Sequence, residues 1–477
     1  MFTEYKGLVD MKLFCSPDKL NFSLVKPSFY LVKPTKLTIK LLFATSVFLS
    51  LAACSDATIG AATKESAIAG VGPNPNLPAP HKSLIPTVNI APALGWPVGG
   101  TPVAAADLAV SAFVRNLDHP RWLYVLPNGD VLVAETNTPA KPEGNKGIKA
   151  WVASVVMKKA GATSASANRI RLLRDTNGDG IADINSVLLE GLNSPFGMTL
   201  VANNLYVANA DAVFKYPYVT GDIKITAKGT KLIDLPGGPI NHHWTKNIIA
   251  SADGSKLYIT VGSNSNVAEN GMAAEEQRAA IWTLDLKTAE YRLFASGLRN
   301  PNGLAWEPIS QKLWVVVNER DELGNDLVPD YLTSVQEGGF YGWPYSYYGA
   351  HIDERVKPQD PALVAQALIP DYALGAHTAS LGLVSALGTS LPTRYRDGMF
   401  VGQHGSWNRK PLSGYKVIFV PFTAGKPNGM PLEVLSGFLS PEGNAFGRPV
   451  GVALDKQGAL LVADDVGNAI WRVTAKK

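Results

Sequence analysis

The feature that most restricts the fold of this chain is a degenerate repeat that begins near residue 107 and continues to the end. Each copy has a short apolar run, a turn containing Gly, Asn or Asp, and a second apolar run, as in Ile248–Ala250 followed by Leu257–Ile259. About six copies occur, at a mean spacing of roughly 65 residues. A third apolar run often follows, for example Ala280–Trp282. Three or four short strands in each copy are typical of the blades of a β-propeller.

The composition agrees with a β fold of this kind. The 477 residues include 44 Gly and 33 Pro, so turns are frequent and long helical periodicity is hard to find. Sheets arranged around an axis bury both faces against their neighbours, which accounts for strands made of aliphatic and aromatic residues. We therefore expect residues 107–477 to be all-β, a six-bladed β-propeller of four-stranded antiparallel blades. Two β-sandwiches are the alternative.

The position just before the first strand of each copy carries the strongest indication of function. In a propeller, the loop that enters each innermost strand opens at one end of the central channel, so equivalent positions converge. This position is occupied by Asp118–Arg121, Ser194–Phe196, His242–Trp244, Arg299–Asn302, His377–Ser380 and Arg448–Pro449. Arginines, histidines and amides at one mouth would suit a small polyanion, because a guanidinium forms paired bonds with a carboxylate. A histidine there could accept a proton at neutral pH. Taken singly, each of these residues would be interpreted as a surface or structural group.

Two acid-rich segments have the chemistry of calcium sites. The first has oxygen-bearing side chains at the first, third, fifth and ninth positions of a loop, with Gly180 at the sixth for the tight turn. These side chains are Asp175, Asn177, Asp179 and Asp183. The twelfth position holds Ser186 where an EF-hand has a bidentate Glu, so a polar turn without metal is an equally good interpretation.

The second acid-rich segment, 318–330, directly follows an expected strand and contains Glu319, Asp321 and Asp326. Crowded carboxylates repel one another unless a cation or an arginine neutralises them. We therefore expect these three side chains to contribute to a metal site. A solvated acidic loop is the alternative.

The N-terminal segment is typical of an export signal. An apolar run of about 13 residues, Leu41–Ala53, follows several lysines and is shorter than the roughly 20 residues that span a bilayer. It ends in Leu51-Ala52-Ala53-Cys54, which resembles a bacterial lipobox. We therefore expect an exported protein that is lipid-anchored through Cys54 in the cell envelope, in the outer membrane because Ser55 follows, and faces the periplasm. A buried apolar segment with a chance cysteine is the alternative, and Met11 or a later start could be the true one.

Charge and cysteine content exclude other classes of protein. Residues 1–54 carry seven Lys and three acidic residues, which leaves 37 basic and 37 acidic residues in the rest of the chain. A nucleic-acid-binding domain would show a basic surplus. Both cysteines, Cys15 and Cys54, lie in the signal segment, so neither a disulfide framework nor a cysteine-ligated zinc site is expected in the domain. Residues 55–106 are rich in Ala, Pro and Gly, and we expect a flexible tether there.

Ordered phrases in the repeat region resemble the PQQ-dependent sugar dehydrogenases: GLRNPNGLAWE at 297–307, NERDELGNDLVPD at 318–330 and GGFYGWP at 338–344. Longer phrases, NHHWTKNIIASADGSKLYITVGS and GQHGSWNRKPLSGYKVIFVPF, are similar to the sorbosone dehydrogenase-like branch of that family. The likeness covers nearly all of 107–477. It implies a six-bladed propeller that holds PQQ over its channel with a calcium ion, Ca²⁺.

The resemblance also implies roles for individual residues. The catalytic histidine of the family corresponds to His243 by the His-Trp-Thr phrase, whereas an ungapped comparison with the glucose dehydrogenases selects His242. An Arg-Asn pair that contacts the quinone corresponds to Arg299 and Asn300, and a late arginine to Arg448. The remaining cofactor-binding candidates are Arg121, from the mouth positions, and His404 and Arg409, where a lysine of the glucose enzymes is replaced.

These roles imply the oxidation of a sugar or a sugar-derived aldehyde. His243 would remove the proton of the substrate hydroxyl, hydride would pass to the C5 carbonyl of PQQ, and Arg299 with Ca²⁺ would stabilise that oxygen. The family's calcium is held largely by backbone carbonyls, in the loop that corresponds to Glu319–Asp321. Electrons would leave to a quinone or a cytochrome. Two other functions stay open: a calcium-dependent propeller hydrolase that acts on lactones or phosphoesters, and a non-catalytic binding lipoprotein.

Overall fold

The computed structural model describes residues 70–81, 87–139, 161, 165–238 and 240–477. The chain divides into two units, Met1–Ile59 and Gly60–Lys477, and every described residue belongs to the second. The expected signal segment, with Cys54, therefore lies outside the described residues. Within the described ranges, none of the helices has the length and hydropathy needed to span a bilayer.

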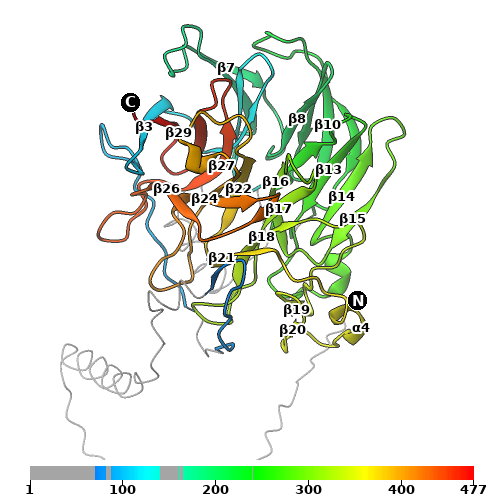
Figure 1. Ribbon diagram of the computed structural model, residues 1–477. Helices are drawn as coiled ribbons and strands as arrows, with labels where there is room; N and C mark the ends of the chain where they lie inside the picture. Colours follow the sequence, from blue (N-terminus) through cyan, green and yellow to red (C-terminus); the bar gives the residue numbers. More distant parts are fainter. Residues whose placement is uncertain (1–69, 82–86, 140–160, 162–164, 239) are drawn as a thin grey trace, which may run out of the picture. The chain divides into compact units, whose positions relative to one another are not determined.

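Six antiparallel sheets form the blades of a β-propeller, which confirms the expected fold (Figure 1). In each blade the strands follow one another outward from the channel. Blade 1 contains β4 (Pro120–Val125), β5 (Val131–Glu135), β6 (Arg169–Arg174) and β7 (Ile184–Leu189). Blade 2 contains β8 (Met198–Val201), β9 (Asn204–Ala208), β10 (Ala212–Pro217) and β11 (Thr230–Asp234). Blade 3 contains β12 (Ile248–Ala250), β13 (Lys256–Val261), β14 (Ala280–Asp285) and β15 (Tyr291–Ser296).

The remaining blades each gain a strand from the N-terminal side of the domain. Blade 4 contains β16 (Asn300–Trp306), β17 (Leu313–Asn318), β18 (Pro329–Ser334) and β21 (Tyr372–Ala376), with β1 (Val71–Gly72) at its outer edge. Blade 5 contains β22 (Ser380–Ser385), β23 (Gly398–Gln403), β24 (Lys416–Thr423) and β26 (Leu432–Ser436), with β2 (Val103–Ala104) at its edge and β25 (Lys426–Pro427) beside β24. Blade 6 contains β27 (Pro449–Leu454), β28 (Leu460–Asp464), β29 (Ala469–Ala475) and β3 (Leu108–Val114).

Blade 6 closes the ring by joining the two ends of the repeat region. Its outermost strand, β3, pairs antiparallel with β29, and Ala112 lies opposite Trp471. The last copy of the repeat has only three strands of its own and takes its fourth from the start of the region. Main-chain hydrogen bonds therefore close the propeller, and they leave no unpaired edge between its first and last copies.

Neighbouring blades pack face to face, and each of the six interfaces has its own apolar cluster. β17 shows why the strands are apolar on both faces. Leu313, Val315 and Val317 pack toward blade 3, whereas Trp314 and Val316 pack toward blade 5. Successive side chains of a strand point to opposite faces, so a strand between two blades must be apolar throughout.

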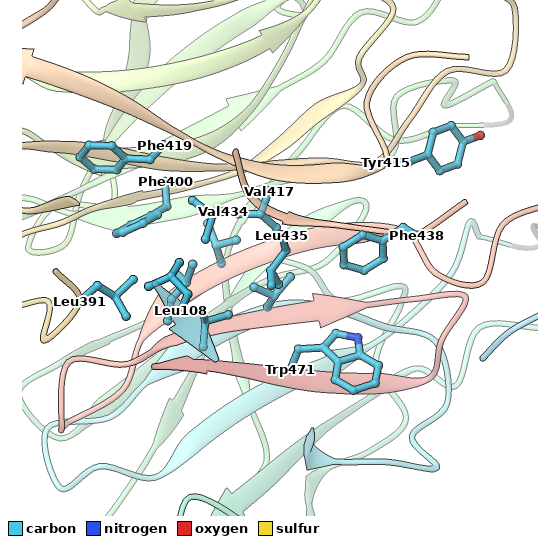
Figure 2. Close-up of a cluster of buried hydrophobic side chains, with 14 of the residues drawn as sticks. Leu108, Leu391, Phe400, Tyr415, Val417, Phe419, Val434, Leu435, Phe438 and Trp471 are labelled. Carbon is cyan, nitrogen blue, oxygen red and sulfur yellow. The ribbon is translucent and has the colours of Figure 1, made fainter. Parts of the chain in front are cut away.

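The interface between blades 5 and 6 contains the cluster shown in Figure 2. Phe400 and Phe419 come from blade 5, and Trp471 comes from blade 6. All three side chains are fully buried. Burying one such side chain contributes about 1.5–3 kcal/mol, so these clusters account for much of the stability of the ring.

The innermost strands lie too close together for side chains at one repeated position. A Cβ atom at Gly382 in β22 would lie 2.1 Å from the carbonyl oxygen of Val450 in the next blade. A Cβ atom at Gly303 in β16 would lie 2.6 Å from the backbone of Leu381 in β22. These glycines recur in the repeat because inner strands of successive blades must touch around the channel.

An insertion interrupts blade 4 between β18 and β21. It contains β19 (Ser346–Tyr347), β20 (His351–Ile352) and the short helix α4 (Pro361–Val364). Asp360 caps this helix by accepting the N–H of Leu363, and proline occupies the first helical position. The other helical turns of the described chain are η1 (Met272–Glu275) and η2 (Thr393–Tyr395), so the domain is almost free of helix, as expected.

Part of the segment expected to be a flexible tether lies on the propeller instead. β1 and β2 extend the outer edges of blades 4 and 5. Ala91 is fully buried in the cluster between blades 5 and 6, and Trp96 Nε1 donates to Asp464 Oδ2 at 2.7 Å. Parts of the backbone of this Pro- and Gly-rich segment pair with strand edges, and the side chains of Ala91 and Trp96 pack in a core cluster. Neither is visible as periodicity along the sequence.

Candidate active site

Two sets of loops meet at one end of the channel. The first set precedes the six inner strands, which contact one another in order around the channel. The second set follows the second strand of each blade, because that strand runs antiparallel to the first. Pro449 at the start of β27 lies opposite Asp464 at the end of β28, and Asn300 lies opposite Asn318 in the same way. Residues from both sets therefore face the same opening.

His243 precedes β12 and is held by the loop that follows β13. Its Nδ1 atom lies 2.9 Å from the carbonyl oxygen of Ser263 and 3.0 Å from Ser263 Oγ. A ring nitrogen that faces a carbonyl must carry the hydrogen, so Nδ1 is the protonated atom and Nε2 has the free lone pair. Burial, reinforced by the charges of Arg299 and His242, holds the pKa of His243 well below its usual value. The ring is therefore a neutral base at pH 7.

His242, the other candidate base, lies differently from its neighbour. Its side chain is exposed, and its ring meets the ring of His243 edge-on at 4.8 Å between centroids. His243 is held by the adjacent loop through the bonds described above.

Arg299 and Asn300 lie beside His243. The Arg299 guanidinium is buried, with Nη1 2.6 Å from the carbonyl oxygen of Glu319 and Nη2 2.9 Å from Asn266 Oδ1. A Cβ atom at Gly262 would lie 2.5 Å from the Cβ of His243 and 2.6 Å from Asn300 Oδ1. The side chains of His243 and Asn300 thus approach each other over Gly262. Asn300 Oδ1 is buried and has no hydrogen-bond partner among the described residues.

A second group of basic residues surrounds Asp465, which follows β28. Asp465 Oδ2 lies 2.6 Å from Arg121 Nη1, 2.8 Å from His404 Nε2 and 3.5 Å from His119 Nε2. Burial would raise the pKa of Asp465, but His404, His119 and Arg121 outweigh it and hold that pKa well below its usual value. Burial lowers the pKa of His404 to about 4 despite the opposing effect of Asp465.

Arg448 completes this basic group, which we call the Asp465 arc: His119, Arg121, His404 and Arg448 around Asp465. Arg448 Nη2 lies 3.3 Å from the carbonyl oxygen of Ala91, and its guanidinium lies 5.3 Å from the ring centroid of Tyr415. The Nε atoms of Arg121 and Arg448 are buried and have no hydrogen-bond partner within the described part of the chain. The arc therefore contains two buried N–H groups that lack an acceptor in the described chain, and buried polar atoms usually have a hydrogen-bond partner.

The Asp465 arc and His243 belong to one site. The guanidinium of Arg121 lies 5.8 Å from the ring centroid of Trp244, the residue after His243. The charge of Arg448 also acts on Arg121, and that of Arg299 acts on His243. The structure thus brings together Arg448, Arg121, His243 and Arg299, which are far apart in the sequence.

The three candidate metal ligands of the acidic loop 318–330 each have a basic partner in the protein. Glu319 Oε2 lies 3.0 Å from Arg320 Nε, and Asp326 Oδ1 lies 2.8 Å from Arg409 Nη2. Asp321 Oδ1 lies 3.2 Å from Nδ1 of His377. The described residues include no group of three or more His, Cys, Asp or Glu that could hold a metal. Glu319 Oε1, however, is buried and has no hydrogen-bond partner among the described residues.

Arg409 differs from Arg121 and Arg448 because each of its guanidinium nitrogens has a partner in the protein. Its Nε donates to the carbonyl oxygen of Asn325 at 2.8 Å, and its Nη1 donates to that of Pro411 at 2.8 Å. With Asp326 on Nη2, the guanidinium fastens two loops together and has no donor atom without a partner.

The other acid-rich loop lies between β6 and β7 of blade 1, away from the channel. Its side chains mostly bond to the loop itself. Asp175 accepts the N–H groups of Gly178 and Gly180 at 2.7 and 2.8 Å, and Asp183 accepts that of Thr176 at 2.6 Å. Asn177 and Asp179 cap the turn in the same way. This loop makes no contact with the site described above.

The sequence did not point to Asp465 or to Asn266, which positions Arg299. Both follow the second strand of a blade, β28 or β13, whereas the mouth positions predicted from the repeat precede the first strand of each blade. The signal was present, because a residue after the second strand must lie at the same end of a blade as a residue before the first. Applied to each copy, that rule would have selected Asp464-Asp465 and Ser263.

Comparisons with known proteins agree with this fold. A family model described as TrAA12-like matches residues 102–337 and 350–476, a range that omits part of the blade 4 insertion. The PQQ domain of pyranose dehydrogenase from Coprinopsis cinerea, solved in its holo form, superposes with a TM-score of 0.63 at 19% identity, over 81% of this chain and 100% of that one.

Two further proteins extend the comparison. A calcium structure of an AA12 carbohydrate-active enzyme from Trichoderma reesei gives a TM-score of 0.62 at 18% identity, over 82% of this chain and 100% of that one. An uncharacterized protein of Borreliella burgdorferi is 28% identical over 302 residues, which cover 60% of this chain and 77% of that protein. Because the family model spans most of the propeller, the chain belongs to the TrAA12-like family, whose structural neighbours are PQQ-dependent sugar dehydrogenases.

Proposed function

We propose that this protein oxidises a sugar or a sugar-derived aldehyde with PQQ as its cofactor. The observation that supports the proposal most strongly is the juxtaposition at one channel mouth of a neutral histidine base and an arc of basic groups. His243 has Nε2 free for a proton, and the Asp465 arc has arginine donors without partners. Membership of the TrAA12-like family, and a fold shared with the PQQ domain of a pyranose dehydrogenase, support the proposal.

The residues of the mouth fit PQQ, a small planar quinone with three carboxylates. Two buried guanidiniums, those of Arg121 and Arg448, each have an Nε–H with no partner in the described chain. A carboxylate would satisfy both, and buried donors without partners are costly. Asn300 and Arg299, beside His243, would hold the quinone end. When bound, PQQ supplies the electron acceptor for a two-electron oxidation.

Calcium is part of the proposal, but not through the carboxylates chosen from the sequence. Glu319 and Asp326 are paired with arginines, and Asp321 is paired with His377. An ion at this mouth would instead be held by backbone carbonyl and amide oxygens together with oxygens of the cofactor. We therefore assign no chemical step to the metal.

The chemistry of the protein itself is proton transfer and charge stabilisation. His243 Nε2 would accept the proton of the substrate hydroxyl, which a lactol or a hydrated aldehyde provides. Its lowered pKa keeps it unprotonated across neutral pH. Arg299, held rigidly by Glu319 and Asn266, would face the negative charge that develops nearby. Ser263 fixes the ring so that the same nitrogen always faces the substrate.

The cellular setting of the proposal comes from the N-terminal segment. A lipidated Cys54 would anchor the protein in the cell envelope. Electrons would then pass to a membrane quinone or a periplasmic cytochrome.

The experiment is reconstitution of the full chain. PQQ is titrated into the protein with and without Ca²⁺ while the quinone absorbance is followed, and dye reduction is then measured with a panel of aldoses and aldehydes. We expect saturable PQQ binding and PQQ-dependent dye reduction. Absence of both would overturn the proposal. Lactone hydrolysis without PQQ would favour the hydrolase, and PQQ binding without turnover would favour a binding protein.

A further inference from the structure

One loop of blade 3 connects the histidine base to the buried arginine. The loop follows β13 and contains Ser263 at one end and Asn266 three residues later. Ser263 faces Nδ1 of His243 with two oxygens, at 2.9 and 3.0 Å. Asn266 holds the guanidinium of Arg299 through its Oδ1 at 2.9 Å and its carbonyl oxygen at 3.3 Å. The conformation of this loop therefore sets both functional side chains.

A buried carboxylate, that of Glu275 in η1, clamps the Ser263 end of the loop. It accepts the backbone N–H of Asn264 at 2.6 Å and the hydroxyl of Ser265. Glu275 is 6% exposed, and Ser263 and Ser265 are completely buried. No water can readily replace the carboxylate there, so the loop depends on it.

This clamp determines the direction of the Ser263 hydroxyl. Ser263 Oγ donates its hydrogen to the carbonyl oxygen of Ser265 at 2.7 Å. With that hydrogen used, Ser263 Oγ can only accept from His243, as the Ser263 carbonyl also does. Both atoms facing Nδ1 are thus acceptors, and the ring must place its hydrogen on Nδ1.

We propose that Glu275 is a positioning residue that fixes His243 in its Nδ1–H tautomer. Without the carboxylate, the N–H of Asn264 and the hydroxyl of Ser265 lose their acceptor, and the Ser265 carbonyl is no longer held in place. The Ser263 hydroxyl can then rotate and donate to Nδ1, where the Ser263 carbonyl is left as the remaining acceptor. Part of the population then carries the ring hydrogen on Nε2, which in that form is no longer a base. The inference depends on the proposed function only for the role of His243, since the tautomer is a property of the free protein.

The other ionisable groups that face the ring do not explain the tautomer. They are Arg299, His242 and Lys246, and each of them acts on His243 by its charge. A charge of this kind disfavours the protonated ring, whereas the hydrogen on Nδ1 is held by the two oxygens of Ser263 that face it. Glu275 sets the direction of one of these two oxygens, the hydroxyl.

The test is nitrogen NMR on the full chain, labelled with ¹⁵N-histidine and free of PQQ. The chain has seven histidines, and the signals of His243 are assigned by their loss in His243→Gln. The wild type should show protonated Nδ1 and unprotonated Nε2. In Glu275→Ala the ratio of the two tautomers should shift at least about fivefold toward Nε2–H, the effect of losing a hydrogen bond.

Glu269→Ala is the matched control. Glu269 is on the same loop and also accepts two backbone N–H groups, those of Asn266 and Val267 at 2.9 and 2.7 Å. It holds the Arg299 end, so its removal should leave the His243 tautomer unchanged. If Glu275→Ala does not fold, Glu275→Gln, which keeps one acceptor oxygen, should show a smaller shift in the same direction.

An unchanged tautomer ratio in the folded Glu275 variant would overturn the inference, as would an equal shift in Glu269→Ala. Because the protein carries no cofactor in this measurement, that failure is distinct from failure of the proposed function. The latter is tested on the wild type by PQQ titration.

Discussion

The two sides of the channel mouth both contain a partly buried histidine with a lowered pKa, but the partners of these histidines differ. On the side of blades 3 and 4, His243 bonds through Nδ1 to a backbone carbonyl, and its Nε2 is free. On the side of blades 5 and 6, His404 bonds through Nε2 to the carboxylate of Asp465, which also binds Arg121. The first histidine can take a proton from a substrate. The second is one of several basic groups gathered by a single carboxylate.

This difference shows that residue type alone does not decide the role of a histidine at such a mouth. Burial is the largest cause of the lowered pKa in both cases. What separates them is which nitrogen is engaged and whether the partner is a neutral carbonyl or an anion. We therefore expect substitutions on the His243 side to change turnover and those in the Asp465 arc to change cofactor affinity.

The largest expected effect is that of His243→Asn. Removing the base should lower turnover by about 10³-fold while the dissociation constant of PQQ changes little, because general base catalysis contributes roughly 10²–10⁴-fold. Steady-state dye reduction and a PQQ titration measure the two quantities separately. His242→Asn is the control and should lower turnover less than about tenfold. Equal losses in the two variants would contradict the division of roles.

Arg448→Met should weaken PQQ binding and leave turnover nearly unchanged, which is the opposite of the result expected for His243→Asn. Loss of one charged donor to a carboxylate should weaken PQQ binding by about 10–100-fold, since such bonds contribute roughly 1.5–3 kcal/mol. Turnover at saturating PQQ should change less than about threefold, because Arg448 lies away from the base. Arg409→Met, whose guanidinium is fully engaged by the acidic loop, provides the comparison. Weaker PQQ binding in Arg409→Met than in Arg448→Met would show that the wrong arginine has been assigned.

Lowering the pH should destabilise the folded protein through His404. Its pKa is about 4 in the folded protein, below the usual value of about 6.5, so the unfolded chain binds the proton more readily. The free energy of unfolding should fall as pH decreases from about 6.5 to about 4, by up to roughly 1–3 kcal/mol from this group. Urea unfolding at several pH values should show a smaller fall in His404→Gln. Identical pH profiles would mean that His404 is not held neutral by burial.

The smallest effect is expected in the outer acidic loop. Asp175→Asn combined with Asp179→Asn should leave turnover and PQQ affinity within about twofold and change stability by about 0.5 kcal/mol, as for most exposed positions. The loop is exposed and satisfies its own hydrogen bonds. Calcium titration by calorimetry provides the check. Loss of a calcium-binding site in this variant would show that the loop is a metal site after all.

The repeat in the sequence was sufficient to predict the six blades and their inner strands. Apolar runs and turn residues are local features of the sequence. In a propeller they recur in every blade, because each blade has the same strands and turns. The same repeat also placed Arg121, His243, Arg299 and Arg448 at one mouth. It could not show that Ala91 and Trp96 are buried on the propeller, because an extended segment without periodicity has no local signature.

What the sequence determined by itself is the architecture, the residue types available at the mouth and the resemblance to a family of enzymes. What only the tertiary structure decided is how those residues are paired. Asp465 gathers three basic side chains, arginines and His377 pair with the acidic loop, and Glu275 acts on His243 through two serines. Most of these pairings join residues from different loops or blades. Hydrogen bonds depend on distances of a few tenths of an ångström, and such distances are set by the closed ring and not by the order of residues along the chain.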